Sequence, residues 1–348
     1  MKKIVLITLS ILIAIDAHPY DFVVDGIAYH IVSASEKTVE VDRNWNPSAF
    51  KNEYSGDITI NENVTYDGTQ FTVIGTVSQT FGDSQITSCN LPNSIISLEE
   101  GTFMDCHELT SVKLPDNIDF LPELCFWGCR SLEEMPITPN LQTIGRYAFQ
   151  GCKKLTKVNI PETVTDIRYG AFMGCEGLVD LLIPKNVVNI EQSAFSWCSQ
   201  LESIEVRCKK LSFEMFAHAN NLKTVRLYDI EYIPSDAFKD CSEIEEIYVN
   251  MISPSPISES AFEQKVIMYA KLYVPTGSIN NYKATEGWKD FFNIIEVEPS
   301  SISTSKMEKK EDTKYFTIDG KMLNTPQKGI NIIQTNNGTA KKVLVKQK

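Results

Sequence analysis

A phenylalanine recurs through the middle of the chain at an almost constant interval. Nine of these residues are separated in turn by 22, 23, 23, 23, 23, 21, 22 and 24 residues. A repeat this short cannot bury its own apolar face, so neighbouring copies must stack to form one core. The interval therefore predicts a repeat solenoid that is rich in β-structure. The phenylalanines are Phe81, Phe103, Phe126, Phe149, Phe172, Phe195, Phe216, Phe238 and Phe262.

Other apolar positions fall at fixed offsets from each phenylalanine. A cysteine follows three residues later in six copies, and a leucine or isoleucine follows six residues later in most. Apolar residues nine and eleven positions later alternate with outward ones, which predicts a short strand with one buried face. Proline ends this strand at Pro115, Pro161 and Pro184, because it has no N–H for the ladder. A second apolar pair, such as Val164 and Ile167, predicts the opposite wall of the coil.

This combination of period, Cys–Leu pair, strand and proline resembles the BspA-like leucine-rich repeat family over roughly Phe81 to Val297. The resemblance implies a protein on the surface of an anaerobic bacterium that binds host matrix proteins, other cells or glycans. The copies that begin at Phe195 and Phe216 lose the proline and part of the spacing. Their local coil geometry is therefore left open.

The N-terminal segment and the net charge indicate where the protein is located and which classes of partner it can bind. Lys2 and Lys3 precede the apolar run 4–15, and Ala17 stands before His18, which is the layout of a secretory signal peptide. We therefore expect an exported chain, secreted or on the cell surface, with no transmembrane helix once the leader is removed. The formal net charge is −12. Nucleic acids and anionic lipids are bound through basic surfaces, so neither is an expected partner.

The chain divides into regions by pattern and composition. Linkers are rich in Ser and charge, and caps are expected because a solenoid must cover its end coils. The expected regions are a signal peptide (1–17), an N-terminal β cap (18–79), leucine-rich repeats (80–262), a C-terminal cap (263–298), a linker (299–312) and a small β unit (313–348).

The aromatic residues of both caps have two interpretations. We expect Trp45, Phe50 and Tyr54 in the core of the N-terminal cap, with an exposed binding patch as the alternative. Tyr282, Trp288, Phe291 and Phe292 are expected to seal the other end beside a short helix over 278–283, and a sugar-stacking role for Trp288 is the alternative.

The last segment resembles the sorting domain of type IX secretion. The similarity lies in the Gly320-Lys321 turn, the segment 328–333 (KGINII) and the segment 342–346 (KVLVK). It implies that the secretion machinery recognises this tail. An ordinary small β domain is the alternative.

Catalytic, metal and cofactor chemistry have no clear signal. The nine cysteines show no zinc spacing, and six share one repeat offset, so we expect a reduced packing column, with disulfides permitted by export as the alternative. The four histidines share no partner motif, and those at His107 and His218 are expected to be solvated. We therefore predict no enzyme, no catalytic residue, no metal and no cofactor.

The outward positions of the predicted strands form the candidate recognition surface. Residues eight and ten positions after each phenylalanine point away from the core, and stacking aligns them at a spacing of about 4.8 Å. A solvated face with weak charge pairs is the alternative. We expect this face to bind an extracellular protein or glycan; a structural envelope component that self-associates is the alternative function. The candidate residues are Lys113, Glu134, Lys157, Asp180, Leu182, Glu205, Arg226 and Tyr248.

Overall fold

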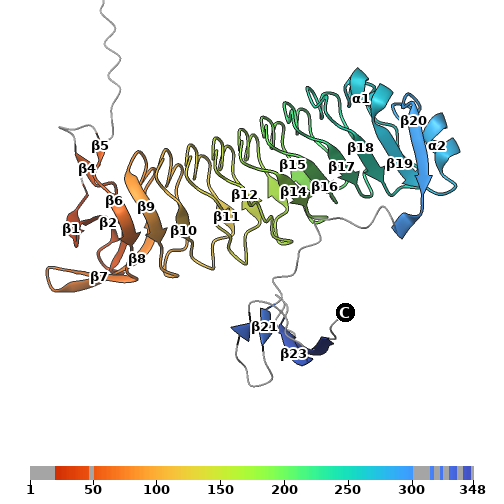
Figure 1. The fold of residues 1–348 in the computed structure, drawn as a ribbon. Coiled ribbons are helices and arrows are strands. Elements are labelled where there is room, and N and C mark those ends of the chain that lie inside the picture. The colour runs from red at the N-terminus through yellow and green to blue at the C-terminus, as the bar shows by residue number, and fades with distance from the viewer. Residues whose placement is uncertain are drawn as a thin grey trace, which may run out of the picture. The chain divides into compact units, whose positions relative to one another are not determined.

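A computed structural model describes residues 20–46 and 51–300, and beyond them the backbone of four strands. The predicted signal peptide (1–17), Phe50 and the predicted linker from residue 301 onward lie outside the described residues. The chain forms two units, Met1–Lys153 and Lys154–Lys348. Both contain coils of a β-solenoid built from short strands and tight turns (Figure 1), so the predicted fold class is confirmed.

The first unit begins with a five-stranded sheet in the order β1-β2-β3-β8-β7, in which only β3 and β8 pair in parallel. Its core is aromatic: Phe22 stacks on Tyr66, with ring centroids 4.2 Å apart. Tyr54 is buried and donates its hydroxyl proton to the carbonyl of Asp42 at 2.8 Å. Tyr54 therefore belongs to the core and is no binding patch. The strands are β1 (Phe22–Val24), β2 (Ile27–Ser33), β3 (Thr38–Val41), β7 (Asn63–Tyr66) and β8 (Thr69–Thr76), beside the pair β4 (Trp45–Asn46) and β5 (Lys51–Asn52).

The first coils follow this sheet. Strands β6 (Ser55–Thr59), β9 (Gln85–Asn90) and β10 (Ser111–Lys113) pair in parallel in the order β10-β9-β6. On the opposite wall, β11 (Phe120–Leu121) pairs in parallel with β12 (Thr143–Ile144). Val112 is only half-buried, and Pro136, at an expected outward position, is buried. Inward and outward positions therefore alternate less regularly here than the pattern predicts.

The repeated phenylalanines form the core of the coils in both units. Phe126 stacks between Phe103 and Phe149, with centroid distances of 5.1 and 5.2 Å. The distance rises to 5.9 Å between Phe195 and Phe216, where the interval shortens to 21 residues. The departures noted in the sequence therefore distort the stack locally but keep the coils intact.

The cysteines have a polar role that the packing interpretation did not include. All nine lie within the described residues, are buried, and form no disulfide there. The thiol of Cys129 donates to the carbonyl of Phe103 at 3.1 Å, and that of Cys241 donates to the carbonyl of Phe216 at 3.1 Å. A buried carbonyl needs such a donor. Each of these cysteines therefore satisfies a backbone group of the preceding coil while filling the core.

Two turn positions in each coil have left-handed backbone. The residues two before and two after each repeated phenylalanine have positive φ in the described coils from Phe81 to Phe238. Glycine adopts this conformation without steric cost, whereas other residues are strained by it. Gly128, Gly151 and Gly174 occupy the later position in three coils.

The second unit contains a six-stranded parallel sheet in the order β14-β16-β17-β18-β19-β20 (Figure 1). Its last two strands come from the predicted C-terminal cap, so the cap extends the sheet of the repeats. On the opposite wall, β13 (Asp166–Ile167) pairs in parallel with β15 (Asn189–Ile190). The six strands are β14 (Asp180–Ile183), β16 (Ser203–Val206), β17 (Thr224–Leu227), β18 (Glu246–Val249), β19 (Lys271–Pro275) and β20 (Asn293–Val297).

Two short helices, α1 (Gln264–Tyr269) and α2 (Ile279–Ala284), complete the cap. Trp288 is fully buried, and its indole N–H donates to the carbonyl of Ser255 at 3.0 Å. Tyr282 packs edge-on against it. The sugar-stacking alternative for Trp288 is therefore wrong. Phe292, which we expected in this cluster, is 73% exposed.

At the C-terminus, four strands form an antiparallel sheet in the order β22-β21-β23-β24. They are β21 (Lys314–Phe316), β22 (Met322–Leu323), β23 (Gly329–Gln334) and β24 (Ala340–Val345). The Gly320-Lys321 turn of the predicted sorting motif lies outside the described residues.

Candidate functional site

The outward face of the six-stranded sheet carries two aligned rows of side chains. Buried residues such as Leu181 and Ile183 alternate with these rows along each strand, because successive side chains point to opposite sides. Parallel register then places one outward residue of each strand beside the next. The outer row is Leu182, Glu205, Arg226, Tyr248, Tyr273 and Ile295, and the second row is Asp180, Ser203, Thr224, Glu246, Lys271 and Asn293.

An aromatic and cationic stack forms the centre of the outer row. The guanidinium carbon of Arg226 lies 4.0 Å from the ring centroid of Tyr248, which is itself stacked on Tyr273 at 4.5 Å. All three side chains are half-buried. A cation over an aromatic face is attracted by the ring quadrupole, so neighbouring strands hold one another's side chains in place. The three side chains therefore form a preformed surface, and binding a ligand would cost them little further rotamer freedom.

Glu246 in the second row fixes the two phenol groups. Its carboxylate accepts hydrogen bonds from the hydroxyls of Tyr248 at 2.9 Å and Tyr273 at 3.3 Å. Burial, followed by the hydrogen bond to Glu246 and its charge, raises the pKa of Tyr248 to about 12. Burial and the same charge also raise the pKa of Tyr273. Both phenols therefore stay protonated as donors at neutral pH.

Glu205 departs from the sequence prediction. It occupies the outer row, but its side chain is fully buried, so the expectation of a ligand contact open to solvent is wrong for this residue. Its Oε1 accepts from Nε and Nη2 of Arg207, at 2.6 and 2.5 Å; Arg207 is two residues further on and directly follows the end of β16. Arg207 covers the carboxylate because side chains two apart share a face. Oε2 of Glu205 and Nη1 of Arg226 are buried without a hydrogen bond among the described residues.

A hollow of about 310 Å³ adjoins the second row. Glu243, Glu246 and Tyr269 contribute to its lining, and Tyr269 is 70% exposed. Lys265 pairs with Glu243 at 2.7 Å, and this hydrogen bond lowers the pKa of that carboxyl group. The hollow beside the tyrosine stack is therefore lined by three glutamates and two lysines, which suits a hydroxyl-rich group that can both donate and accept hydrogen bonds.

The remaining predicted residues lie apart from this stack. Lys113, on β10, and Glu134 are exposed in the first unit. In the second unit Lys157 is exposed outside the sheet, and Asp180 is exposed on β14, where it accepts a hydrogen bond from Ser203. Leu182 is half-buried. The structure therefore brings together Leu182, Glu205, Arg226 and Tyr248 of the predicted set.

Sequence reasoning missed Tyr273, Lys271 and Arg207. Tyr273 and Lys271 lie in the segment KLYVP, whose alternation of inward Leu272 and Val274 with outward residues matches that of the repeat strands. That pattern could have identified them. No local pattern points to Arg207, because its role depends on the burial of Glu205.

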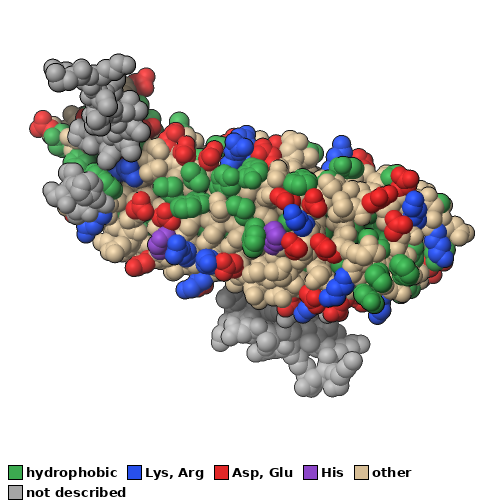
Figure 2. Space-filling model, turned by 90° about the horizontal axis from the view of Figure 1, so that it is seen from above, with side chains coloured by type: hydrophobic (Ala, Val, Ile, Leu, Met, Phe, Trp, Pro, Cys, Tyr) green, Lys and Arg blue, Asp and Glu red, His purple; other side chains and the backbone are tan. Residues whose placement is uncertain are grey.

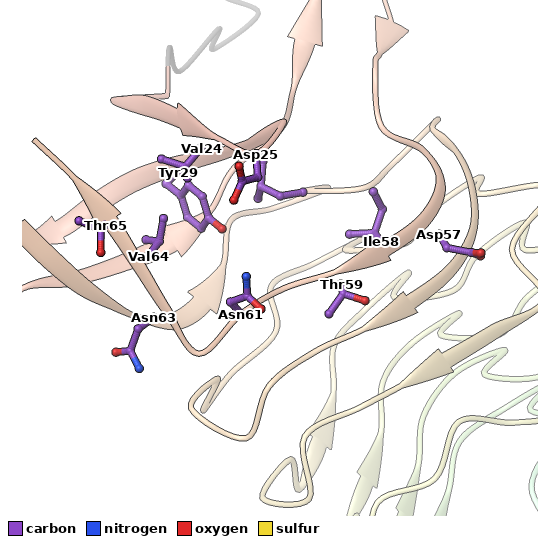
Figure 3. Close-up of a pocket in the computed structure, with 11 residues that line it drawn as sticks. Val24, Asp25, Tyr29, Asp57, Ile58, Thr59, Asn61, Asn63, Val64 and Thr65 are labelled. Atoms are coloured by element: carbon purple, nitrogen blue, oxygen red, sulfur yellow. The ribbon is translucent and has the colours of Figure 1, made fainter.

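A second hollow of about 450 Å³ lies in the N-terminal sheet of the first unit. Figure 3 shows that its polar side chains come from the β1–β2 turn, with Asp25, and from the segment that runs from β6 through Asn61 into β7. Asp57, at its edge, accepts hydrogen bonds from Ser88 at 2.6 Å and Thr87 at 2.8 Å, which lower its pKa. The Asp57 carboxylate is therefore already hydrogen-bonded to side chains of the neighbouring strand β9.

Metal-binding clusters and membrane-spanning helices are both absent from the described part of the chain. Within it, no group of three or more His, Cys, Asp or Glu side chains is arranged to hold a metal ion. Of the helices described, neither is long and apolar enough to cross a membrane.

Comparison with known proteins places the chain in a family. The sequence model of the BspA type leucine-rich repeat region matches six copies, over residues 72–202 and 142–268. Among curated proteins no match was found.

Several solved structures are similar. A leucine-rich repeat protein of T. pallidum, TpLRR, is 23% identical over 56% of this chain and 87% of its own, with a TM-score of 0.48. One from Bacteroides ovatus is 21% identical over 80% and 89%, with a TM-score of 0.43. The pneumococcal vaccine antigen PcpA is 14% identical over 79% and 98%, with a TM-score of 0.43. Because the family match spans more than half of the sequence, the chain belongs to the BspA type leucine-rich repeat family.

Proposed function

We propose that the chain is an exported surface protein, not an enzyme, that binds an extracellular protein or glycan through the outer row of the six-stranded sheet. The stack of Arg226, Tyr248 and Tyr273 is the observation that carries this proposal. Arg and Tyr are enriched among the residues that dominate binding energy. Because these side chains are already stacked, and the two phenols are hydrogen-bonded to Glu246, a ligand would immobilise few additional rotamers.

The electrostatic setting favours a ligand with cationic or hydroxyl groups. The hollow beside the stack is lined by three glutamates and two lysines, and the whole chain has a net charge of −12. Complementary charge speeds encounter and selects among partners. The exposed Lys157 and Asp180 of the second unit belong to the proposal as peripheral contacts, and the exposed Lys113 and Glu134 of the first unit are proposed as contacts of that unit. Contacts at the rim of an interface contribute little energy.

The test uses the full chain on an array of matrix proteins and glycans, beside the variants Arg226→Ala, Tyr248→Ala and Tyr273→Ala. Each variant is expected to weaken a selective interaction about tenfold or more. Tyr232→Ala is the matched control, since Tyr232 is 49% exposed but lies outside the six-stranded sheet. Binding that all three variants retain would overturn the assignment to this face.

A structural envelope component that self-associates is the second candidate. β20 is the last strand of the sheet, and its neighbour Phe292 is 73% exposed, with Ile295 at 38%. An exposed sheet edge with apolar side chains is a template for pairing with another chain. Sedimentation at rising concentration tests this role: an oligomer that Ile295→Lys dissociates would favour it, whereas a monomer at all concentrations would exclude it.

We further propose that residues 1–17 direct export and that the unit 313–348 is recognised by the secretion machinery. The order of charge and apolar residues at the N-terminus and the KGINII and KVLVK segments support this. Deletion of 313–348 should retain the protein inside the cell envelope, as measured by fractionation of the producing cells. Unchanged appearance at the surface would exclude the sorting role.

A further inference from the structure

A tryptophan occupies one of the strained turn positions. In the second unit, the second residue after each phenylalanine from Phe172 to Phe238 is Gly174, Trp197, His218 or Asp240, with φ of 70°, 63°, 64° and 58°. A non-glycine residue pays about 1–2 kcal/mol for left-handed backbone, and a bulky one is rare there. The coil geometry imposes this backbone in every coil from Phe81 to Phe238, and Trp197 is the bulkiest residue that adopts it.

The adjoining coils hold the Trp197 ring in one orientation. Its backbone N–H donates to the carbonyl of Ala217 at 2.8 Å. The indole stacks on the imidazole of His218, with centroids 4.0 Å apart and 25° between the planes. Nδ1 of His218 lies 2.9 Å from Oδ2 of Asp240. The expectation that His218 is merely solvated is therefore wrong, because it supports Trp197 from the next coil.

The ring remains accessible although one face is covered. Trp197 is 54% exposed. The equivalent residue of the preceding coil, Gly174, has no side chain that could cover the other face. Figure 2 shows apolar and histidine side chains among charged ones on one face of the molecule. The uncovered face of the indole is therefore open to a ligand.

Two amide side chains lie near Trp197, one along the chain and one in the next coil. Gln200 follows Trp197 by three residues, which places their Cα atoms within about 10 Å. Asn221 of the next coil donates to Oε1 of Gln200 at 3.4 Å. Amide side chains both donate and accept, and a sugar ring presents a C–H face bordered by hydroxyl groups. We propose that Trp197, supported by His218, is a carbohydrate-binding site in which the sugar ring stacks on the indole, with the amides of Gln200 and Asn221 in the same two coils as candidate partners for its hydroxyl groups.

This site goes beyond the proposed function of the outer row and is independent of it. The two sites use different side chains, so each can fail without the other. The Trp197 proposal requires only the local geometry of its three coils.

The test measures binding of neutral hexoses, N-acetylhexosamines and their oligomers to the full chain, by glycan array and by tryptophan fluorescence. Trp197→Gly introduces the residue that the preceding coil carries at this position, so the backbone is not strained by the change. It should abolish the fluorescence change and weaken binding at least about tenfold. Trp197→Tyr keeps an aromatic face and should retain most of the binding. Tyr232→Ala, which lies outside both proposed sites, should leave this binding unchanged.

Three results would overturn the proposal. The first is that none of these sugars binds, and the second is that Trp197→Gly binds them as well as the wild type. The third is that only cationic ligands, such as tetramethylammonium, quench Trp197, which would assign the ring to cation recognition. Sugar binding that is lost in Trp197→Gly but kept in Tyr232→Ala would support this site, whatever the variants of the outer row do.

Discussion

The phenylalanines of the interior and the left-handed position two residues after them differ in how much they vary between coils. The interior position is phenylalanine in all nine copies, whereas the turn position is Asp, Gly, Trp or His. Each interior ring has to fit the rings above and below it, so one residue type satisfies every coil. The turn position only requires a left-handed backbone conformation, so its side chain is free to vary and can take part in recognition.

The interior should give the largest effect on stability. Phe195→Ala removes a fully buried ring that stacks on Phe172 at 5.0 Å and is expected to lower the free energy of unfolding by about 3–5 kcal/mol. Urea denaturation followed by circular dichroism measures the change. Tyr232→Ala is the surface control, with an expected change within about 0.5 kcal/mol. Equal shifts for the two variants would contradict the role of the phenylalanine stack.

The cysteines should make the interior sensitive to alkali. Burial raises the pKa of Cys106, Cys198 and Cys241 from 9.0 to about 12. Above pH 9 the unfolded thiols lose protons that the folded ones retain. Stability is therefore fully present below pH 9 and falls as the pH rises toward 12, by up to about 1.4 kcal/mol per pH unit for each thiol.

Urea denaturation between pH 8 and 10.5 tests this, with Cys198→Val as the comparison that should have a shallower slope. Alkylation by iodoacetamide provides a second measurement, because buried thiols should react only after unfolding. Labelling of the native chain at the rate of the unfolded chain would contradict the buried column.

On the outer row, the pair of Glu205 and Arg207 should give an intermediate effect. Glu205→Gln removes one charge of a pair whose carboxylate is fully buried, and we expect a loss of about 2 kcal/mol in the free energy of unfolding. Asp180→Asn, on the exposed end of the same face, should change it by less than about 0.5 kcal/mol. If Glu205→Gln left the free energy of unfolding unchanged, the Glu205 carboxylate would have to be solvated in solution.

The turn position should give the smallest effects, and they should differ between neighbouring coils. Gly174→Ala places a Cβ on backbone with φ of 70° and should cost about 1 kcal/mol. Trp197→Gly relieves similar strain but loses the stack on His218, so the net change should lie within about 1 kcal/mol of zero. Thermal denaturation of both variants measures the contrast. A large loss in Trp197→Gly would assign Trp197 to the core.

The sequence alone determined the solenoid and its inward positions, because a regular period and fixed offsets are local properties that every stacked coil must satisfy. It also located Arg226 and Tyr248 on one face, since alternation along a strand follows from backbone geometry.

Only the tertiary structure decided which side chains meet across coils. The burial of Glu205 under Arg207, the extension of the sheet to Tyr273, the thiol hydrogen bonds and the Trp197–His218 stack were beyond the sequence pattern. Most of these contacts join residues about one coil apart in the sequence. They are determined by the size and charge of the neighbours that stacking brings together, which no single repeat encodes.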